Sequence, residues 1–301
     1  MGGESFMELT ISNLTKEFGT LRAVDHVNFT MTNGVYGLLG VNGAGKTTLM
    51  RMLTTLIKPT SGEILWDRQD VYAMDGQYRK LLGYLPQDFG YYPDFSIYDY
   101  LMYIASIKGI RPTVAKERVK LLLKQVGLVR ARHKKMKTLS GGMKRRAGIA
   151  QAMLNDPKIL ILDEPTAGLD PSERIRFRNL ISELSEDRIV LLSTHIVSDI
   201  EYIANEILLM KDGCITMSGT AEEIVASMPE KVWTFTVPKA QIDAYLKAYK
   251  VANVKTVPGG AELRVLSPVR PNSSAVEAEP NLEDAFLYHF GESAGEDDGV
   301  V

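Results

Sequence analysis

The sequence has almost no cysteine, since Cys214 is the single one among 301 residues. One cysteine cannot close a disulfide within the chain, which is typical of proteins in a reducing compartment. No segment approaches the ~20 consecutive apolar residues that a membrane-spanning helix needs. The opening MGGESFMELT also has neither the basic nor the apolar segment of a secretory signal. We therefore expect a chain that neither crosses a membrane nor is secreted.

The sequence also has little net charge, −2 in total, so composition alone favours no particular partner. The charge is unevenly distributed, however. Residues 220–301 carry 7 Lys/Arg against 13 Asp/Glu, a net −6, so the first 219 residues carry +4. Together with the Pro/Ser/Glu-rich run at 267–280, this contrast predicts a first domain over 1–228 and an accessory domain over 229–301. The acidic end GESAGEDDGVV is typical of a disordered tail.

Short apolar runs alternate with segments of helical period. The runs ILILD at 159–163 and IVLLS at 189–193 are apolar at both odd and even positions, as in strands covered on both faces. Residues 177–184 show the spacing of an amphipathic helix. Buried strands alternating with helices predict an α/β layered fold. The strand-like segments at 8–14 and 24–32 predict an antiparallel patch beside it.

The C-terminal part has a different pattern. Residues 231–238 resemble a strand, and residues 239–249 a helix with one apolar face. A hairpin through Gly259 and Gly260 follows, and then a final helix at 281–290. This order predicts a small α+β appendage.

Residues 40–48 read GVNGAGKTT and match the pattern of a phosphate-binding loop, between a strand-like and a helix-like segment. A glycine-rich turn formed by chance is the alternative. In such a loop the backbone N–H groups and the helix dipole bind phosphates. Lys46 would reach the β and γ phosphates, and Thr47 would bind Mg²⁺. The predicted ATP-binding residues of the loop are Gly40, Asn42, Gly43, Ala44, Gly45, Lys46, Thr47 and Thr48.

Polar groups follow three other predicted strands. Asp163 could bind magnesium directly or through water, and Glu164 would point to the other side of the strand axis, where it could polarise an attacking water. A helix cap or a solvated turn is the alternative for this acidic pair. His195 follows the strand at 189–193 and could sense the γ-phosphate, although a structural histidine is the alternative. Gln87, in YLPQD, is by itself only a surface amide.

Residues 139–143 read LSGGM and lie between these motifs. Over residues 8 to about 220, the order and spacing resemble the ATPase subunit of ABC transporters. The resemblance implies that GVNGAGKTT is the Walker A motif, ILILDE the Walker B motif and LSGGM the signature. It also implies that Gln87 lies in the Q-loop, that Ala167 to Asp170 form the D-loop, and that His195 is the switch histidine. In that family the signature serine and glycines press on the γ-phosphate of ATP held by the opposite subunit.

The resemblance further implies a P-loop NTPase (RecA-like) core, with an antiparallel β subdomain and an inserted helical subdomain at about 88–157. It implies ATP and Mg²⁺ as ligands, and a second nucleotide-binding subunit as partner, most simply in a homodimer. The catalytic residues are then Glu164, His195 and Gln87, the magnesium ligands are Thr47, Gln87 and Asp163, and ATP also contacts Phe18, Ser140, Gly141, Gly142 and Asp170.

Two positions depart from the family pattern. Met143 stands where glutamine is commonest, which leaves the phosphate-facing atoms intact but removes a polar side chain near the nucleotide. Phe18 stands where a tyrosine usually stacks on adenine, and it keeps the stacking face. The alternative for Phe18 is an ordinary core aromatic.

The chain has one set of motifs, unlike translation-associated members with two cassettes. Only about fifty residues separate Gln87 from Ser140, without the sustained heptads of chromosome and repair members. The ending NLEDAFLYHFGE resembles ATPases that drive small bacterial exporters. This implies a separate transmembrane permease, a peripheral position at the cytoplasmic side of the membrane, and no nucleic acid. The alternative is a stand-alone regulatory or assembly ATPase.

Two surface stretches remain. The basic residues at 130–137, with those at 144–146, fit a solvated face of the helical subdomain, with a nearby membrane surface or nucleic acid as alternatives. The aromatic stretch at 88–103 follows Gln87, where the family docks its membrane partner. The core of the helical subdomain accounts for part of those aromatics.

Overall fold

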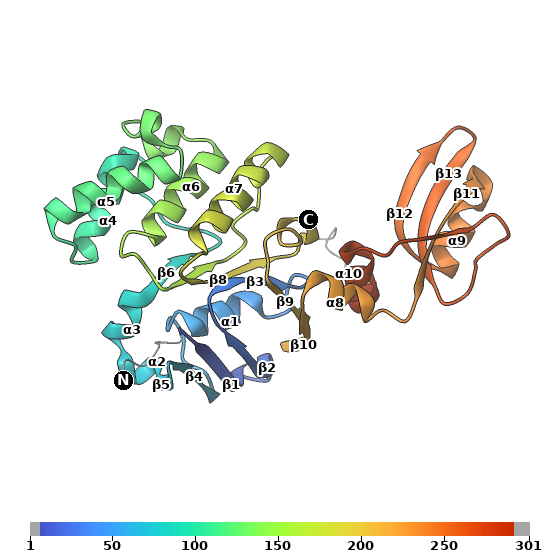
Figure 1. Ribbon diagram of the computed structural model, residues 1–301, viewed down its shortest axis with the longest axis horizontal. Helices are drawn as coiled ribbons and strands as arrows, with labels where there is room; N and C mark the ends of the chain where they lie inside the picture. Colours follow the sequence, from blue (N-terminus) through green and yellow to red (C-terminus); the bar gives the residue numbers. More distant parts are fainter. Residues whose placement is uncertain (1–6, 292–301) are drawn as a thin grey trace. The chain divides into compact units, whose positions relative to one another are not determined.

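The computed structural model describes residues 7–291 (Figure 1), so the predicted disordered tail lies outside the described residues apart from Gly291. Contacts divide the chain into two compact units, Met1–Thr216 and Met217–Val301. This division falls before the boundary predicted at residue 228. Within the described residues, no helix is long and apolar enough to cross a membrane.

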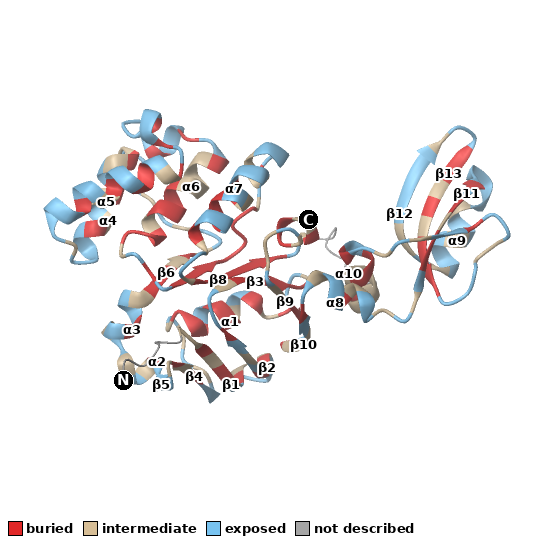
Figure 2. Ribbon diagram, in the orientation of Figure 1, coloured by how far each residue is buried: buried red, intermediate tan, exposed pale blue. Residues whose placement is uncertain are grey.

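The main sheet contains the buried strands that the apolar runs predict. Strand β3 (Gly34–Leu39), which precedes the phosphate loop, pairs in parallel with β8 (Ile189–Thr194) and β9 (Glu206–Lys211). Strand β7 (Ile159–Leu162) pairs in parallel with β8 and with β6 (Leu82–Leu85). Every residue of β7 and β8 is buried (Figure 2), as expected of strands covered on both faces. The order in the sheet is β10 (Cys214–Gly219), β9 (Glu206–Lys211), β3 (Gly34–Leu39), β8 (Ile189–Thr194), β7 (Ile159–Leu162) and β6 (Leu82–Leu85).

The predicted antiparallel patch is a second sheet in the same unit. Its order is β2 (Leu21–Met31), β1 (Leu9–Phe18), β4 (Ser61–Trp66) and β5 (Gln69–Asp70). Leu9 and Ile11 of β1 share one hydrophobic core with Leu49 and Met50 of helix α1 (Lys46–Leu53). The antiparallel sheet thus packs on the helix that follows the phosphate loop.

Helices lie between β6 and β7 and after β7. Helices α4, α5 and α6 pack against one another, as an inserted helical subdomain requires. In α7, the predicted apolar face is buried, including Phe177 and Leu180. The helices of this unit after α1 are α2 (Val71–Met74), α3 (Gly76–Leu81), α4 (Ile97–Ile107), α5 (Pro112–Gln125), α6 (Gly141–Ala152) and α7 (Pro171–Leu184), with short 3-10 turns at Val129–Ala131, Met136–Thr138 and Val197–Asp199.

The second unit contains the predicted strand, helix, hairpin and final helix. Its sheet has the order β12 (Lys250–Val257), β13 (Gly260–Ser267), β11 (Lys231–Pro238) and β14 (Val276–Ala278). A 3-10 turn at Lys239–Gln241 leads into α9 (Ile242–Ala248), whose Ile242 and Tyr245 pack on Trp233 and Phe235 of β11. Helix α8 (Ala221–Ala226) packs against α10 (Leu282–Phe290), which is why this unit begins before residue 228.

The polar residues of NLEDAF have structural roles in this unit. Asn281 and Asp284 form a capping box at the start of α10. The buried Asp284 carboxylate also binds Arg264 of β13, with Arg264 Nη2 2.6 Å from Asp284 Oδ2. This buried charge is therefore paired, as burial requires.

Candidate functional site

The loop between β3 and α1 has the backbone shape of a phosphate-binding loop. Gly43 and Gly45 have φ values of +79° and +103°, a region that favours glycine. A Cβ on Gly45 would lie 2.3 Å from the carbonyl oxygen of Ala23, so the chain packs too tightly here for a side chain. The capping residue of α1, Gly45, makes no side-chain cap to the helix. The backbone N–H groups at this N-terminus have no side-chain cap and can thus bind an anion.

Lys46 is buried beside this loop, with 7% of its side chain exposed. Its Nζ donates to the carbonyl oxygens of Gly40 (2.7 Å) and Val41 (3.0 Å), and lies 3.9 Å from Glu164 Oε1. Burial lowers the pKa of Lys46, while the Glu164 and Asp163 carboxylates act in the opposite direction. The ammonium is thus held between the phosphate loop and the end of β7.

Asp163 and Glu164 are joined to the neighbouring strand by Ser193. The Ser193 hydroxyl donates to Asp163 Oδ1 (2.7 Å) and accepts from the Glu164 backbone N–H (2.9 Å), and all three residues are buried. The other carboxylate oxygen, Asp163 Oδ2, is buried and has no hydrogen-bond partner. A buried carboxylate oxygen with no partner fits a magnesium ligand, because Mg²⁺ prefers oxygen ligands.

Glu164 does not reach its position by the alternation of a strand. Strand β7 ends at Leu162, and Glu164 has a φ of +46°, so the prediction that strand alternation orients Glu164 was wrong. The backbone turn brings its carboxylate to His195, whose Nδ1 lies 3.2 Å from Glu164 Oε1 and 3.1 Å from Oε2. His195 is half exposed, at 45%, whereas Glu164 is buried. The carboxylate is therefore oriented by the imidazole on one side and approached by Lys46 on the other.

The phosphate loop, Glu164 and His195 line one cavity of about 710 Å³ within the first unit, whereas the predicted site residues Gly40 and Asp163 are not among its lining residues. Its size fits a nucleotide-sized ligand. The lining includes predicted residues from several motifs, namely Phe18, Asn42, Gly43, Ala44, Gly45, Lys46, Thr47, Thr48, Gln87, Glu164 and His195. It also includes Leu21, Arg22, Ala23, Ala167, Asp212 and Gly213, to which the sequence analysis gave no binding role.

Phe18 and Leu21 form an apolar edge of this cavity. They face each other across the turn between β1 and β2, and they are 49% and 65% exposed. Their exposure excludes the core alternative for Phe18. Lys16 Nζ lies 5.2 Å from the centre of the Phe18 ring.

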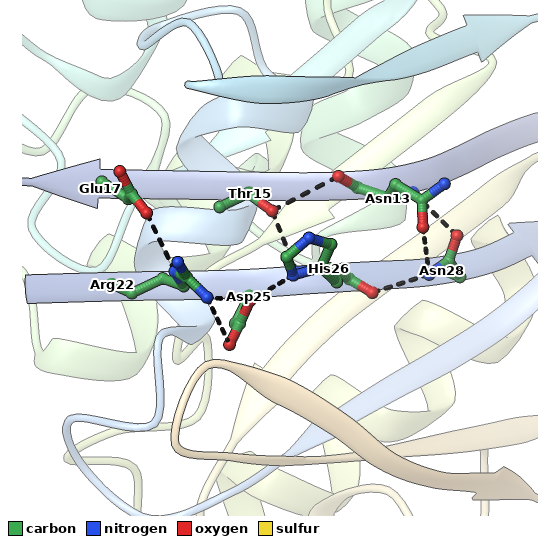
Figure 3. A network of polar contacts seen from close by, with 7 residues as sticks. All are labelled: Asn13, Thr15, Glu17, Arg22, Asp25, His26 and Asn28. Atoms are coloured by element: carbon green, nitrogen blue, oxygen red, sulfur yellow. Dashed lines mark hydrogen bonds and ion pairs between the residues drawn. The ribbon is translucent and has the colours of Figure 1, made fainter.

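Arg22 is held at the cavity by a polar network (Figure 3). Its Nε donates to Glu17 Oε1 (3.0 Å) and its Nη1 to Asp25 Oδ1 (3.1 Å), and His26 Nδ1 lies 2.5 Å from the same Asp25 oxygen. The hydrogen bond with His26, and then the interactions with Arg22, lower the pKa of Asp25. Glu17 and Arg22 are cross-strand partners, so the hairpin register was the signal that could have revealed this pair.

The signature lies outside this cavity. Ser140 caps α6, and its Oγ accepts from the Met143 backbone N–H (3.2 Å). Gly141 is exposed, and a Cβ there would meet only the carbonyl oxygen of Gly168, at 3.8 Å. A Cβ on Gly142, by contrast, would lie 2.6 Å from Glu173 Oε2. Packing inside the chain thus favours a glycine at 142, but gives no reason for the one at 141.

Asp170 also lies outside the cavity. It is exposed and caps α7, where its Oδ1 accepts from the Glu173 backbone N–H (2.9 Å). This backbone hydrogen bond and those with Ser172 lower the pKa of Asp170. Ser140, Gly141 and Asp170 are thus exposed at the N-termini of helices α6 and α7.

The basic residues fall into two groups. Lys135 and Lys137 are exposed and pair with Asp94, at 3.3 and 2.7 Å. The basic residues at 144–146 are instead partly buried, so the solvated-face interpretation was wrong for them.

The aromatic stretch at 88–103 is divided between the core and the surface. Tyr100 is buried, whereas the residues of 92–103 that cluster at the surface are Tyr92, Phe95 and Tyr103, with ring centres 4.9 to 5.7 Å apart.

The first unit combines a strand–loop–helix phosphate site with an Asp-Glu pair and a histidine in an α/β fold. These features define a nucleotide-binding ATPase of the P-loop class. The family profile described as ABC transporter matches residues 24–167. The Bacillus subtilis (strain 168) ABC transporter ATP-binding protein YxlF is 37% identical over 79% of this chain and 79% of its own length. YhcH from the same organism is 33% identical over 96% of this chain and 97% of its own length. The bacitracin transport ATP-binding protein BcrA of Bacillus licheniformis is 39% identical over 67% of this chain and 66% of its own length.

Among solved structures, the chain is similar to the ATP-binding cassette MJ0796, a dimer in a post-hydrolysis state bound to ADP and phosphate. The TM-score is 0.64 at 25% identity, over 70% of this chain and 98% of that one. This chain belongs to the family of ABC transporter ATP-binding proteins, and it is an ATPase.

Proposed function

We propose that this chain binds Mg-ATP, dimerises around two ATP molecules and powers export through a separate permease. The observation that carries the proposal is the separation of the motifs. Lys46, Glu164 and His195 line one cavity, while Ser140 and Gly141 are exposed outside it. A second copy would bring its own Ser140 and Gly141 onto the ATP in this cavity. The dimeric cassette bound to ADP and phosphate supports that arrangement.

Within the site, each group has a proposed role. Lys46 and the loop N–H groups bind the phosphates, and Phe18 stacks on the base. Glu164 accepts a proton from the attacking water as general base, in an orientation fixed by His195. Magnesium would be held by Thr47, Gln87 and Asp163, and it would neutralise charge on the phosphate oxygens.

Glu164→Gln tests the assignment of the base. The variant should lose ATP hydrolysis and keep ATP affinity, because the phosphate loop is untouched. Lys46→Ala is the contrasting variant, since it removes a cation from the phosphate site and should weaken ATP binding itself. Normal turnover by Glu164→Gln would refute the role of Glu164.

The surface cluster of Tyr92, Phe95 and Tyr103 is the proposed permease contact. Tyr92 and Tyr103 are 47% and 37% exposed and joined by a hydrogen bond of 3.2 Å between their hydroxyls. Exposed aromatic clusters are typical of protein interfaces. The relative named as a bacitracin transport ATP-binding protein supports a role in transport. A chain that docks on a permease in this way would lie at the cytoplasmic side of the membrane.

The permease contact can be tested by co-expression with a candidate permease, that is, a membrane protein with several hydrophobic spans from an adjacent reading frame. We expect co-purification in detergent, and its loss in a Tyr92→Ala/Tyr103→Ala variant. Tyr202→Ala is the matched control, because Tyr202 is a 74% exposed tyrosine elsewhere on the same unit. A protein that binds no such permease but hydrolyses ATP as a dimer would favour the stand-alone regulatory ATPase instead.

A further inference from the structure

Helix α6 is attached by side chains to the segment that carries Gln87. Arg145 of this helix donates from Nη1 to the backbone carbonyl oxygens of Gln87 (2.6 Å) and Pro86 (3.3 Å). Gln87 is exposed and lines the nucleotide cavity. One guanidinium on the signature helix therefore fixes the backbone at the edge of the ATP site.

Two neighbours of Arg145 strengthen this attachment. Gly148 lies one helical turn further on, and a Cβ there would come within 2.6 Å of Leu85 Cδ1 and 3.2 Å of the Phe89 ring. Lys144 Nζ lies 5.2 Å from the centre of the Tyr91 ring, within cation–π range. The helix thus contacts this segment before, at and after Gln87.

The charge of Arg145 suits a fixed contact. Burial lowers the pKa of Arg145, and the carboxylates of Asp88, Asp163 and Glu164 oppose that effect. A guanidinium remains charged at any physiological pH, and its planar donors lose little freedom when they bind carbonyls. The partly buried cation thus stays in place beside the site carboxylates.

We propose that Arg145 is a positioning residue for Gln87. It holds the backbone of Gln87 against α6, so that the Gln87 amide reaches the bound nucleotide and its metal only while α6 is in place. The inference rests on the proposed role of Gln87 in the ATP site. Because Ser140 and Gly141 begin the same helix, α6 would carry the contact with the partner's ATP and the support of Gln87 on one rigid element.

Arg145→Ala should lower kcat for ATP hydrolysis by roughly tenfold to a hundredfold, the cost of misplacing a site group by about 1 Å. The KM for ATP should change little, because the phosphate loop and Phe18 are untouched. The concentration of Mg²⁺ needed for half-maximal activity should rise, because Gln87 is a proposed magnesium ligand.

Arg118→Ala is the matched control. Arg118 also has a partly buried guanidinium that donates to a backbone carbonyl oxygen, that of Leu154 (2.9 Å), but it lies away from Gln87.

A double-mutant cycle separates positioning from general support of the helix. If Arg145 acts through Gln87, Arg145→Ala should lower kcat in the parent and add little in a Gln87→Ala background. An equal loss of kcat from Arg145→Ala in both backgrounds would overturn the inference. So would an Arg145→Ala protein whose kcat and Mg²⁺ dependence equal those of the parent protein. A Gln87→Ala variant with parental kcat and Mg²⁺ dependence would instead refute the proposed role of Gln87, on which the inference depends.

If Arg145→Ala does not fold, Arg145→Gln gives the same test. Its shorter amide cannot span both carbonyl oxygens, so a folded variant should still show the loss of kcat at an unchanged KM. A folded Arg145→Gln with parental kcat and Mg²⁺ dependence would overturn the inference.

Discussion

Ser193→Ala is the perturbation whose effect follows most directly from the geometry of the site. The hydroxyl is fully buried, donates to Asp163 Oδ1 and accepts from the Glu164 backbone N–H. A hydrogen bond to a charged group contributes about 1.5–3 kcal/mol, and a buried N–H without a partner costs about 1–3 kcal/mol. We therefore expect the free energy of unfolding of the first unit to fall by about 2.5–6 kcal/mol.

For a unit of this size, that loss corresponds to a decrease in Tm of roughly 5–25 °C. Thermal unfolding followed by circular dichroism would measure it, with ATP hydrolysis assayed below the transition. Activity should fall as well, because Asp163 and Glu164 lose their common partner. Ser185→Ala is the control, since its hydroxyl makes one surface bond to the Ser182 carbonyl, and such surface changes stay within about 0.5 kcal/mol. A Ser193→Ala protein that unfolds and hydrolyses ATP like this control would refute the bridging role.

Three further predictions concern the loop and the second unit. Gly45→Ala should destabilise the protein by at least about 1 kcal/mol and weaken ATP binding in a titration, because an alanine cannot adopt the native φ or fit against the Ala23 carbonyl. Arg264→Ala should lower the stability of the second unit by about 3 kcal/mol in chemical denaturation, because it leaves the buried Asp284 carboxylate without its cation, and ATP affinity should not change. Truncation after Gly219 should also preserve ATP affinity in a folded product, because every residue that lines the cavity lies before that position.

Local patterns in the sequence predicted much of the fold. The apolar runs of β7 and β8 and the amphipathic spacing of α7 are properties of neighbouring residues, so their burial could be predicted. The phosphate loop was predictable for the same reason, because its glycines, Lys46 and Thr47 are contiguous. The C-terminal strand, helix and hairpin followed from turn signals such as Gly259-Gly260.

The supporting contacts could not be predicted, because they join residues far apart in the chain. Ser193 bridges the ends of two strands, and nothing in its neighbours indicates that its partner is Asp163. The partly buried state of Arg145 depends on α6 packing against β6, so the run KRR resembled a solvated surface. Glu164 follows the end of β7 and itself has a left-handed backbone conformation. The alternation of side chains along a strand cannot predict such a turn.

In the proposed function, two copies of this chain complete each other's ATP sites. The most direct test is the mass of the Glu164→Gln protein by sedimentation with Mg-ATP, compared with the Glu164→Gln/Gly141→Asp variant. The chain has a mass of 33.4 kDa. We expect a particle of twice that mass for Glu164→Gln and a monomer for the double variant, because the added carboxylate would repel the γ-phosphate held by the partner. Equal masses for the two proteins in Mg-ATP would contradict it.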